Sequence, residues 1–275
     1  MIDVSAYLRR LKYYGPAAPT LDTLRALHLA HLYAVPFENL DIHLGRPIVL
    51  DEARFFDKIV TGWRGGFCYE LNGLFAVLLR ELGFDVSLLS AGVYEAEHDR
   101  FGPEGDHLTL LVRLDEPWLA DVGFGDSFRE PLRLNEAGEQ AQNGMAYCLF
   151  SKGDEWRMME RGPDSRWQAG YLFTLKPRRL YDFTYACHYM QTSPDSHFTQ
   201  KRVCSRATPE GRVTLSDMKL IITTDGQRQE RLLNDDAEYR LALKDYFGVV
   251  LPAEACFRHP MVFNYQNNDS LPQHH

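Results

Sequence analysis

One cysteine in the sequence stands where the backbone makes a thiol reactive. Cys68 follows the paired glycines Gly65 and Gly66 and opens a helical apolar pattern that runs to Leu82. The first N–H groups of a helix and the positive end of its dipole favour a thiolate over a thiol, and the thiolate is the nucleophile. The glycines let the backbone approach closely. Cys68 is therefore a candidate nucleophile.

A nucleophilic cysteine needs a base, and the base needs a partner that orients it. His107 begins the strand-like run HLTLLVRL and Asp121 ends the next one, WLADV, so adjacent antiparallel strands would bring the two together. Each residue also has an ordinary interpretation: Cys68 as a small buried hydrophobe, His107 as a core or surface histidine, Asp121 as a turn residue. Spacing alone leaves both interpretations open.

Other short patterns do not favour a nucleotide fold or a metal site. GFGD (123–126) lacks the third glycine of a dinucleotide fingerprint, and no GxxxxGK[ST] motif occurs. His28 and His31 are three residues apart on a helical pattern, yet no third ligand is evident nearby, so no metal is predicted. The five cysteines are scattered without a CxxC pair, which predicts free thiols.

The elements that must position these residues change in kind along the chain. Apolar residues at helical spacing occur at 4–11, 21–35, 51–60 and 68–82, with Thr20 as the N-cap of the second run and Gly83 after the last. Short β-rich runs follow at 86–94, 107–114, 118–122, 147–150, 156–159 and 171–175. After the polar stretch 192–201, two strands (213–215 and 218–224) and a helix (236–247) are predicted.

Length and charge limit the class of protein. With 275 residues, 45% of them hydrophobic, the chain can bury a sizeable core in two packed units or in one large unit with a subdomain. A net charge of −8 without a Lys/Arg-rich run opposes nucleic-acid binding, although a few local groups can still hold one phosphorylated ligand. No membrane span or signal peptide is apparent, which predicts a cytosolic protein.

Four motifs in order along the chain resemble those of the arylamine N-acetyltransferase family: VPFENLDI (35–42), RGGFCYELN (64–72), DHLTLLV (106–112) and DVGFGDS (121–127). TSPDSHF (192–198) and TPEG (208–211) extend the resemblance over nearly the whole chain. It implies an α+β fold with a helical bundle (1–84), an antiparallel β-barrel (85–191) and a C-terminal α/β lid (192–275). The implied catalytic core is papain-like or transglutaminase-like.

The same resemblance assigns a catalytic triad to Cys68, His107 and Asp121. It implies that the acetyl group of acetyl-CoA passes through an acetyl-cysteine to the nitrogen of an arylamine or arylhydrazine, or to the oxygen of an N-hydroxyarylamine, with ping-pong kinetics. Acetyl-CoA is then a donor, and no permanently bound cofactor is expected. Arg64 and Glu38 are expected to brace the loop under the cysteine, as an Arg–carboxylate pair can do.

Binding residues are implied in the same way. Phe37, Phe124 and Phe198 are expected to line an apolar slot for an aromatic acceptor, although each also suits a core position. Gly125 and Thr208 are expected near CoA. A monomer or weak homo-oligomer is expected. The sequence does not fix the oligomeric state.

Three rival hypotheses use the same fold or the same three residues. An amide synthase would close a macrolactam from a carrier-bound chain, and a transglutaminase-like or protease-like enzyme would use the same three residues on another substrate. A binding module would keep the fold without turnover, although the presence of all three candidate side chains argues against it. Genomic context would separate the amide synthase, and acetyl-CoA turnover without peptide cleavage would exclude the transglutaminase-like or protease-like enzyme. Modification of Cys68 by acetyl-CoA would argue against the binding module.

Overall fold

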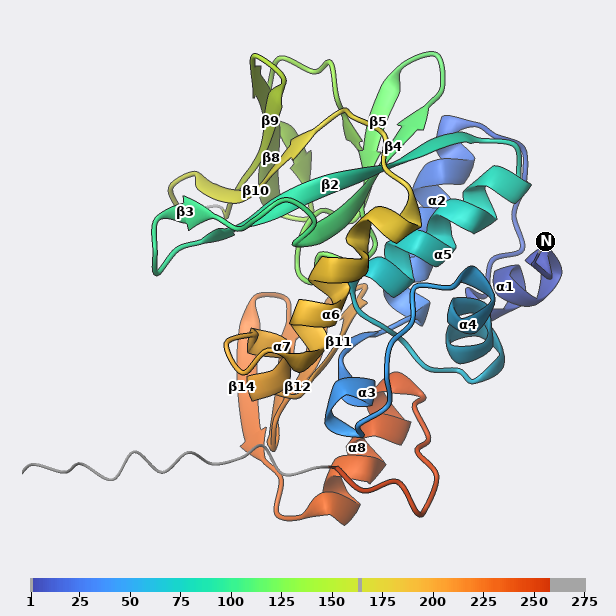
Figure 1. Ribbon diagram of the computed structural model, residues 1–275, viewed down its shortest axis with the longest axis vertical. Coiled ribbons are helices and arrows are strands. Elements are labelled where there is room, and N and C mark those ends of the chain that lie inside the picture. The colour runs from blue at the N-terminus through green and yellow to red at the C-terminus, as the bar shows by residue number, and fades with distance from the viewer. Residues whose placement is uncertain (1, 163–164, 258–275) are drawn as a thin grey trace, which may run out of the picture.

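In the computed structural model, which describes residues 2–162 and 165–257, a group of helices lies beside a large curved sheet, and a smaller sheet lies below both (Figure 1). The large sheet is antiparallel and curls into a nearly closed barrel. The predicted α+β class with an antiparallel barrel is confirmed.

The N-terminal helices follow the predicted apolar spacing, except for the short α3, which was not predicted. They are α1 (Val4–Arg10), α2 (Leu21–Ala34), α3 (Leu40–His43), α4 (Glu52–Phe56), η1 (Asp57–Thr61) and α5 (Cys68–Glu81). Thr20 caps α2 as predicted, because its hydroxyl oxygen accepts a hydrogen bond from the N–H of Thr23. The predicted helix at 51–60 is present, but its second half widens into the π-helical turn η1. The N–H of Gly62 there donates to the carbonyl of Asp57 at 2.7 Å.

Helix α5 is the central helix of the molecule. It lies between the other helices and strands β2 (Asp85–Glu95) and β4 (His107–Arg113) (Figure 1). Leu71, Phe75 and Leu78 are fully buried, and the helix is surrounded by protein on nearly all sides. Gly83 follows it with φ +90°, the left-handed conformation predicted for the residue after the helix. Burial of this kind holds the first residue of α5 in a fixed place.

The register of the large sheet brings two predicted site residues to one edge. Its strands run in the order β6-β5-β4-β2-β10-β9-β8-β7, with β3 paired to β2. The remaining strands are β3 (Arg100–Phe101), β5 (Pro117–Ala120), β6 (Leu132–Arg133), β7 (Gln140–Gln142), β8 (Met145–Lys152), β9 (Glu155–Arg161) and β10 (Gln168–Thr174). Because Leu110 pairs with Ala120, the start of β4 at His107 and the residue after β5, Asp121, lie at the same edge.

Three helical elements in the second half of the chain occur where none was predicted. The range expected for the barrel ends in η2 (Leu180–Phe183) and α6 (Thr184–Thr192), and the polar stretch 192–201 contains α7 (His197–Gln200). In η2 and α6 only Phe183 and Cys187 are buried, both within the core around α5. A stripe this narrow gives little helical periodicity in the sequence.

The smaller sheet draws one strand from the N-terminal part of the chain. Its order is β1-β11-β12-β13-β14, comprising β1 (Phe37–Glu38), β11 (Val203–Thr208), β12 (Gly211–Ser216), β13 (Lys219–Thr224) and β14 (Gln227–Leu232), and α8 (Asp236–Phe247) follows. The two predicted strands and the helix are present, whereas β1, β11 and β14 were missed. Every residue of β14 is exposed, so its sequence has no apolar alternation. The part of the expected lid at 258–275 lies outside the described residues.

Candidate active site

Cys68 is the first residue of α5, where the sequence predicted it. The N–H of Phe67, the N-cap, donates to Glu70 Oε2 at 3.1 Å, which fixes the first turn of the helix. Cys68 is buried, with 4% of the residue exposed. The Cys68 thiol lies near enough to the His107 ring to contribute to raising the pKa of the imidazole.

His107 and Asp121 form a short buried contact. His107 Nε2 lies 2.6 Å from Asp121 Oδ2, and both residues are buried. Burial alone disfavours the charged imidazole, but the carboxylate of Asp121 and the thiol of Cys68 outweigh it and raise the His107 pKa to about 10. Burial likewise disfavours the Asp121 carboxylate, yet His107 keeps its pKa below the ordinary value. The structure thus brings the three candidate residues together, with an imidazolium favoured at neutral pH.

Neutral groups hold Asp121 in place from several sides. Asn72 Nδ2 donates to Asp121 Oδ1 at 2.8 Å, and the N–H of Gly123 donates to the same oxygen at 2.9 Å. Asn72 also accepts from the N–H of Val122 at 2.9 Å. Asn72 lies one helical turn after Cys68, so this i, i+4 spacing was the signal that sequence reasoning missed.

The backbone after Asp121 packs directly on the start of α5. A Cβ atom added to Gly123 would lie 2.8 Å from the Cα of Cys68 and 3.2 Å from its carbonyl oxygen. Real Cβ contacts do not become that short, so only glycine permits this approach. The loop that begins at Asp121 is therefore seated against the candidate nucleophile.

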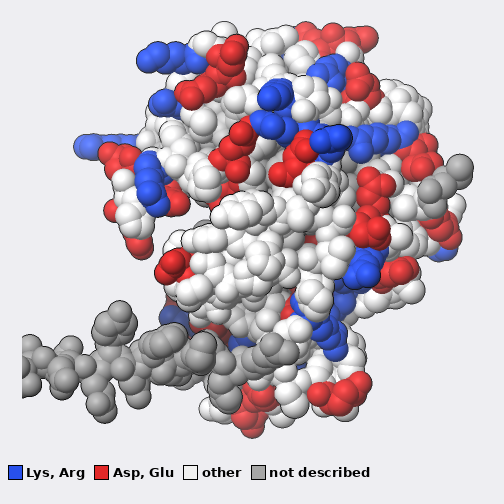
Figure 2. All heavy atoms as spheres, viewed as in Figure 1, with Lys and Arg blue, Asp and Glu red and all other residues white. Residues whose placement is uncertain are grey.

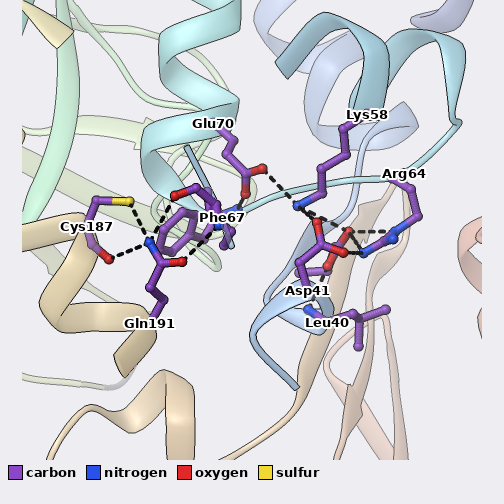
Figure 3. Close-up of polar contacts among 10 residues, drawn as sticks. Leu40, Asp41, Lys58, Arg64, Phe67, Glu70, Cys187 and Gln191 are labelled. Carbon is purple, nitrogen blue, oxygen red and sulfur yellow. Dashed lines mark hydrogen bonds and ion pairs between the residues drawn. The ribbon is translucent and has the colours of Figure 1, made fainter. Parts of the chain in front are cut away.

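Five buried or mostly buried charged side chains lie beneath the loop that leads to Cys68, and we call them the ionic cluster (Figure 3). They are Glu38, Asp41, Lys58, Arg64 and Glu70. Arg64 binds Glu38 at 2.8 Å and Asp41 at 3.1 Å. Lys58 Nζ lies 2.8 Å from both Asp41 and Glu70. The expected Arg64–Glu38 pair is present, and the sequence did not reveal the other three members because they converge only in the fold.

Mutual attraction sets the charge states in the ionic cluster. Burial disfavours each charge, but the surrounding carboxylates outweigh it and raise the pKa values of Lys58 and Arg64. The same two cations outweigh the burial of Asp41 and lower its pKa. For Glu70 burial prevails over Lys58, and its pKa is raised. The cluster therefore supports the charge of Glu70 less than that of Asp41.

The three predicted slot aromatics fall into two groups. The rings of Phe37 and Phe198 are 6.0 Å apart, whereas the ring of Phe124 lies 5.2 Å from that of His107. All three are partly exposed, as a surface that receives a ligand requires. The Phe124 ring also meets Tyr171 at 4.9 Å, and Tyr171 is a fully buried neighbour of His107 that no sequence motif indicated.

The two residues expected near CoA lie on segments joined by arginines. Arg212 donates to the carbonyl of Gly125 at 2.7 Å, and Arg129 donates to that of Thr208 at 2.8 Å. Gly125 has φ +96°, and nothing would lie within 4 Å of a Cβ atom there. The two arginines connect the loop after Asp121 to the β11–β12 hairpin, and neither was singled out from the sequence.

The two histidines of α2 do not share a ligand site. His28 contacts the backbone of Arg129 and Asp121, whereas His31 Nε2 lies 3.0 Å from the hydroxyl of Tyr7. Within residues 2–162 and 165–257, no group of three or more His, Cys, Asp or Glu side chains is arranged to hold a metal. All five cysteines lie in the described part of the chain and are free thiols.

The face seen in Figure 2 mixes Lys and Arg with Asp and Glu around a broad uncharged area. This face therefore offers no continuous basic surface of the kind that nucleic acids require. Among the described helices, none has the length and apolar character needed to cross a membrane.

Comparisons with known proteins agree with this architecture. A family profile described as N-acetyltransferase matches residues 20–256. An arylamine N-acetyltransferase / N-hydroxyarylamine O-acetyltransferase of Salmonella typhimurium is 38% identical over 89% of this chain and 88% of its own length. A proansamycin X synthase of Amycolatopsis mediterranei is 34% identical over 87% of this chain and 95% of its own. The solved structure of Mycobacterium marinum arylamine N-acetyltransferase in complex with CoA matches with a TM-score of 0.83 at 34% identity, covering 90% of this chain and 93% of that one.

The fold and these matches together define an enzyme of the acyltransferase class. The match runs over most of the chain and over most of each relative's length. The chain belongs to the arylamine N-acetyltransferase family.

Proposed function

We propose that this enzyme transfers the acetyl group of acetyl-CoA to an aromatic amine or hydrazine through Cys68, with His107 as the base and Asp121 as its orienting partner. The observation that carries the proposal is the 2.6 Å contact of His107 with Asp121 beside the thiol of Cys68. Family membership supports the donor and the acceptor, because one relative is named for arylamine acetylation and another was solved with CoA.

The first half-reaction loads the enzyme. Because Asp121 occupies Nε2 of His107, Nδ1 is the nitrogen that takes the thiol proton. The Cys68 sulfur attacks the carbonyl carbon of the thioester, and backbone N–H groups, including that of Cys68, hold the oxyanion, at about 3–4 kcal/mol per donor. The bond from that carbon to the CoA sulfur then breaks, and CoA leaves with the proton from His107.

The second half-reaction transfers the acetyl group from Cys68 to the acceptor. The acceptor nitrogen attacks the acetyl carbon, His107 takes the N–H proton, and the bond from the acetyl carbon to Cys68 breaks. The oxygen of an N-hydroxyarylamine is an acceptor in the same sense. Phe37, Phe124 and Phe198 are the proposed contacts of the aromatic ring, supported by their partial exposure. The donor leaves before the acceptor reacts, so the kinetics are ping-pong.

Intact-mass measurement tests the proposal directly. Mixing the enzyme with acetyl-CoA should add about 42 Da, and an aromatic amine added afterwards should remove it. Cys68→Ala should stay unmodified, whereas Cys256→Ala, which removes an exposed thiol, should behave as wild type. A wild-type protein that remains unmodified would overturn the proposal.

A second candidate function is an amide synthase that closes a macrolactam, favoured by the 34% identity to a proansamycin X synthase. The two functions differ in their acyl donor. An amide synthase would ignore acetyl-CoA and acylate Cys68 only with a carrier-bound or thioester chain. Acetylation of Cys68 followed by transfer to aniline decides for the acetyltransferase.

A further inference from the structure

His28 contacts the loop after Asp121 at both of its ends. Its Nδ1 lies 2.8 Å from the carbonyl oxygen of Arg129, and its Nε2 accepts from the N–H of Asp121 at 3.1 Å. A carbonyl oxygen only accepts, so Nδ1 carries the hydrogen and Nε2 presents a lone pair. Only the neutral ring in this one tautomer makes both contacts.

The surroundings of His28 keep the ring neutral and fix its orientation. Its ring stacks on Phe128 at 5.8 Å and 15°, and the edge contact with Phe75 is at 6.2 Å. Burial lowers the His28 pKa to about 4, against the opposing effects of the Arg129 carbonyl and the Asp121 charge. The charged and titratable groups that face it are Asp121 and, on its own helix, His31.

The segment that His28 spans carries residues assigned to the reaction. Residues 121–129 form no helix or strand, and they include Asp121, Phe124 and Gly125. Arg129 continues the connection, since its guanidinium donates to the carbonyls of Thr208 and Gly211 at 2.8 Å. One imidazole thus connects the candidate Asp of the triad to the β11–β12 turn.

We propose that His28 is a positioning residue for the transfer, which holds Asp121 against His107 by accepting the Asp121 N–H while it holds Arg129 at the other end of the loop. The inference rests on the proposed function. His28 is fully buried and acts through the backbone of Asp121. A misplacement of about 1 Å at a catalytic group can cost roughly 100-fold in rate.

Three substitutions separate the two contacts. In His28→Gln the amide oxygen reaches the position of Nε2 and can accept from Asp121, whereas in His28→Asn the amide nitrogen replaces only Nδ1 and its contact with Arg129. His28→Leu removes both. The matched controls are the same changes at His31, which is equally buried on the same helix but bonds to Tyr7.

The rate of Cys68 acetylation in a single turnover, followed by intact mass, is the first readout. We expect His28→Leu and His28→Asn to be slowed roughly 10- to 100-fold and His28→Gln to recover most of the rate. Melting temperatures should fall in both the His28 and the His31 series. Equal rates for His28→Gln and His28→Asn, or rate losses that follow melting temperature alike in both series, would overturn the inference.

Alkylation of Cys68 by iodoacetamide between pH 5 and 9 is the second readout, and it needs no acyl donor. His28→Asn should shift this profile towards higher pH, because a displaced Asp121 supports the imidazolium less, and His28→Gln should keep the wild-type profile. A wild type that acetyl-CoA does not modify would count against the proposed function alone. The alkylation profiles would still decide the role of His28, and identical profiles for all variants would reject it.

Discussion

Two regions hold the candidate active site, and they use opposite chemistry. On the side of Cys68, the ionic cluster packs five charged groups beneath the loop and the first turn of α5. On the side of Asp121, the partners other than His107 are neutral: the Asn72 amide, the Gly123 N–H and the His28 ring. In the ionic cluster, opposite charges neutralise one another. Around Asp121, which we call the neutral region, dipoles of uncharged groups surround a single carboxylate.

This difference has a consequence for His107. Because the other groups that bond to Asp121 are neutral, its charge is not shared with a second cation and acts on the imidazole, whose pKa is about 10. A second cation paired with Asp121 would reduce the effect of the carboxylate on the His107 pKa. The neutral groups around Asp121 therefore set the pKa of His107, the candidate base. The ionic cluster fixes the backbone that carries Cys68, the candidate nucleophile.

The largest effect should follow from neutralising Asp121. Asp121→Asn keeps the shape but removes the charge that supports the His107 imidazolium, and we expect acetylation of Cys68 to slow by about 10⁴-fold, as in other triads. Single-turnover mass measurement checks the rate. Asp115→Asn, an exposed residue in the turn between β4 and β5, is the control and should have no effect. A loss below about tenfold would contradict the assigned role.

Breaking the ionic cluster should mainly lower the free energy of unfolding rather than change the pKa of His107. Arg64→Leu leaves Glu38 and Asp41 buried without their guanidinium partner, and removing one member of a buried pair costs about 3–5 kcal/mol of the free energy of unfolding. Urea denaturation measures it. Arg113→Ala, which breaks an exposed pair with Asp85, should cost no more than about 1 kcal/mol. Similar losses in both variants would contradict the buried role of Arg64.

The sequence predicted these two regions unequally. Cys68 was found because a glycine pair before a helix is a local pattern, and the apolar spacing of α5 revealed its burial. Arg64 and Glu38 were named only through family resemblance. Lys58 and His28 were not assigned to the site, because a residue acquires a partner 12 or 93 positions away only when the chain folds. Local periodicity carries no information on such contacts.

The contribution of His28 to the free energy of unfolding should also fall in acid. The folded pKa of His28, about 4, lies below the ordinary value of 6.5, so between these values the unfolded chain binds a proton that the folded chain does not. The free energy of unfolding therefore falls as the pH drops below 6.5, by about 2 kcal/mol from this group between pH 7 and pH 5. Urea unfolding at both pH values checks this. His28→Gln should lose about 2 kcal/mol less than wild type over that range, and an equal loss would contradict a neutral His28.

The smallest effect should come from within the ionic cluster, at Glu70, whose pKa is raised by burial. Glu70→Gln keeps an oxygen for the N–H of Phe67, and Lys58 keeps its 2.8 Å contact with Asp41, so we expect a loss of about 1 kcal/mol in the free energy of unfolding. Glu38→Gln weakens charged hydrogen bonds to Arg64 and should cost about 2–3 kcal/mol. Urea midpoints of the two variants at pH 7 rank them. A larger loss for Glu70→Gln than for Glu38→Gln would contradict this ranking. It would mean that the Lys58–Glu70 pair contributes more to the free energy of unfolding than the raised Glu70 pKa indicates.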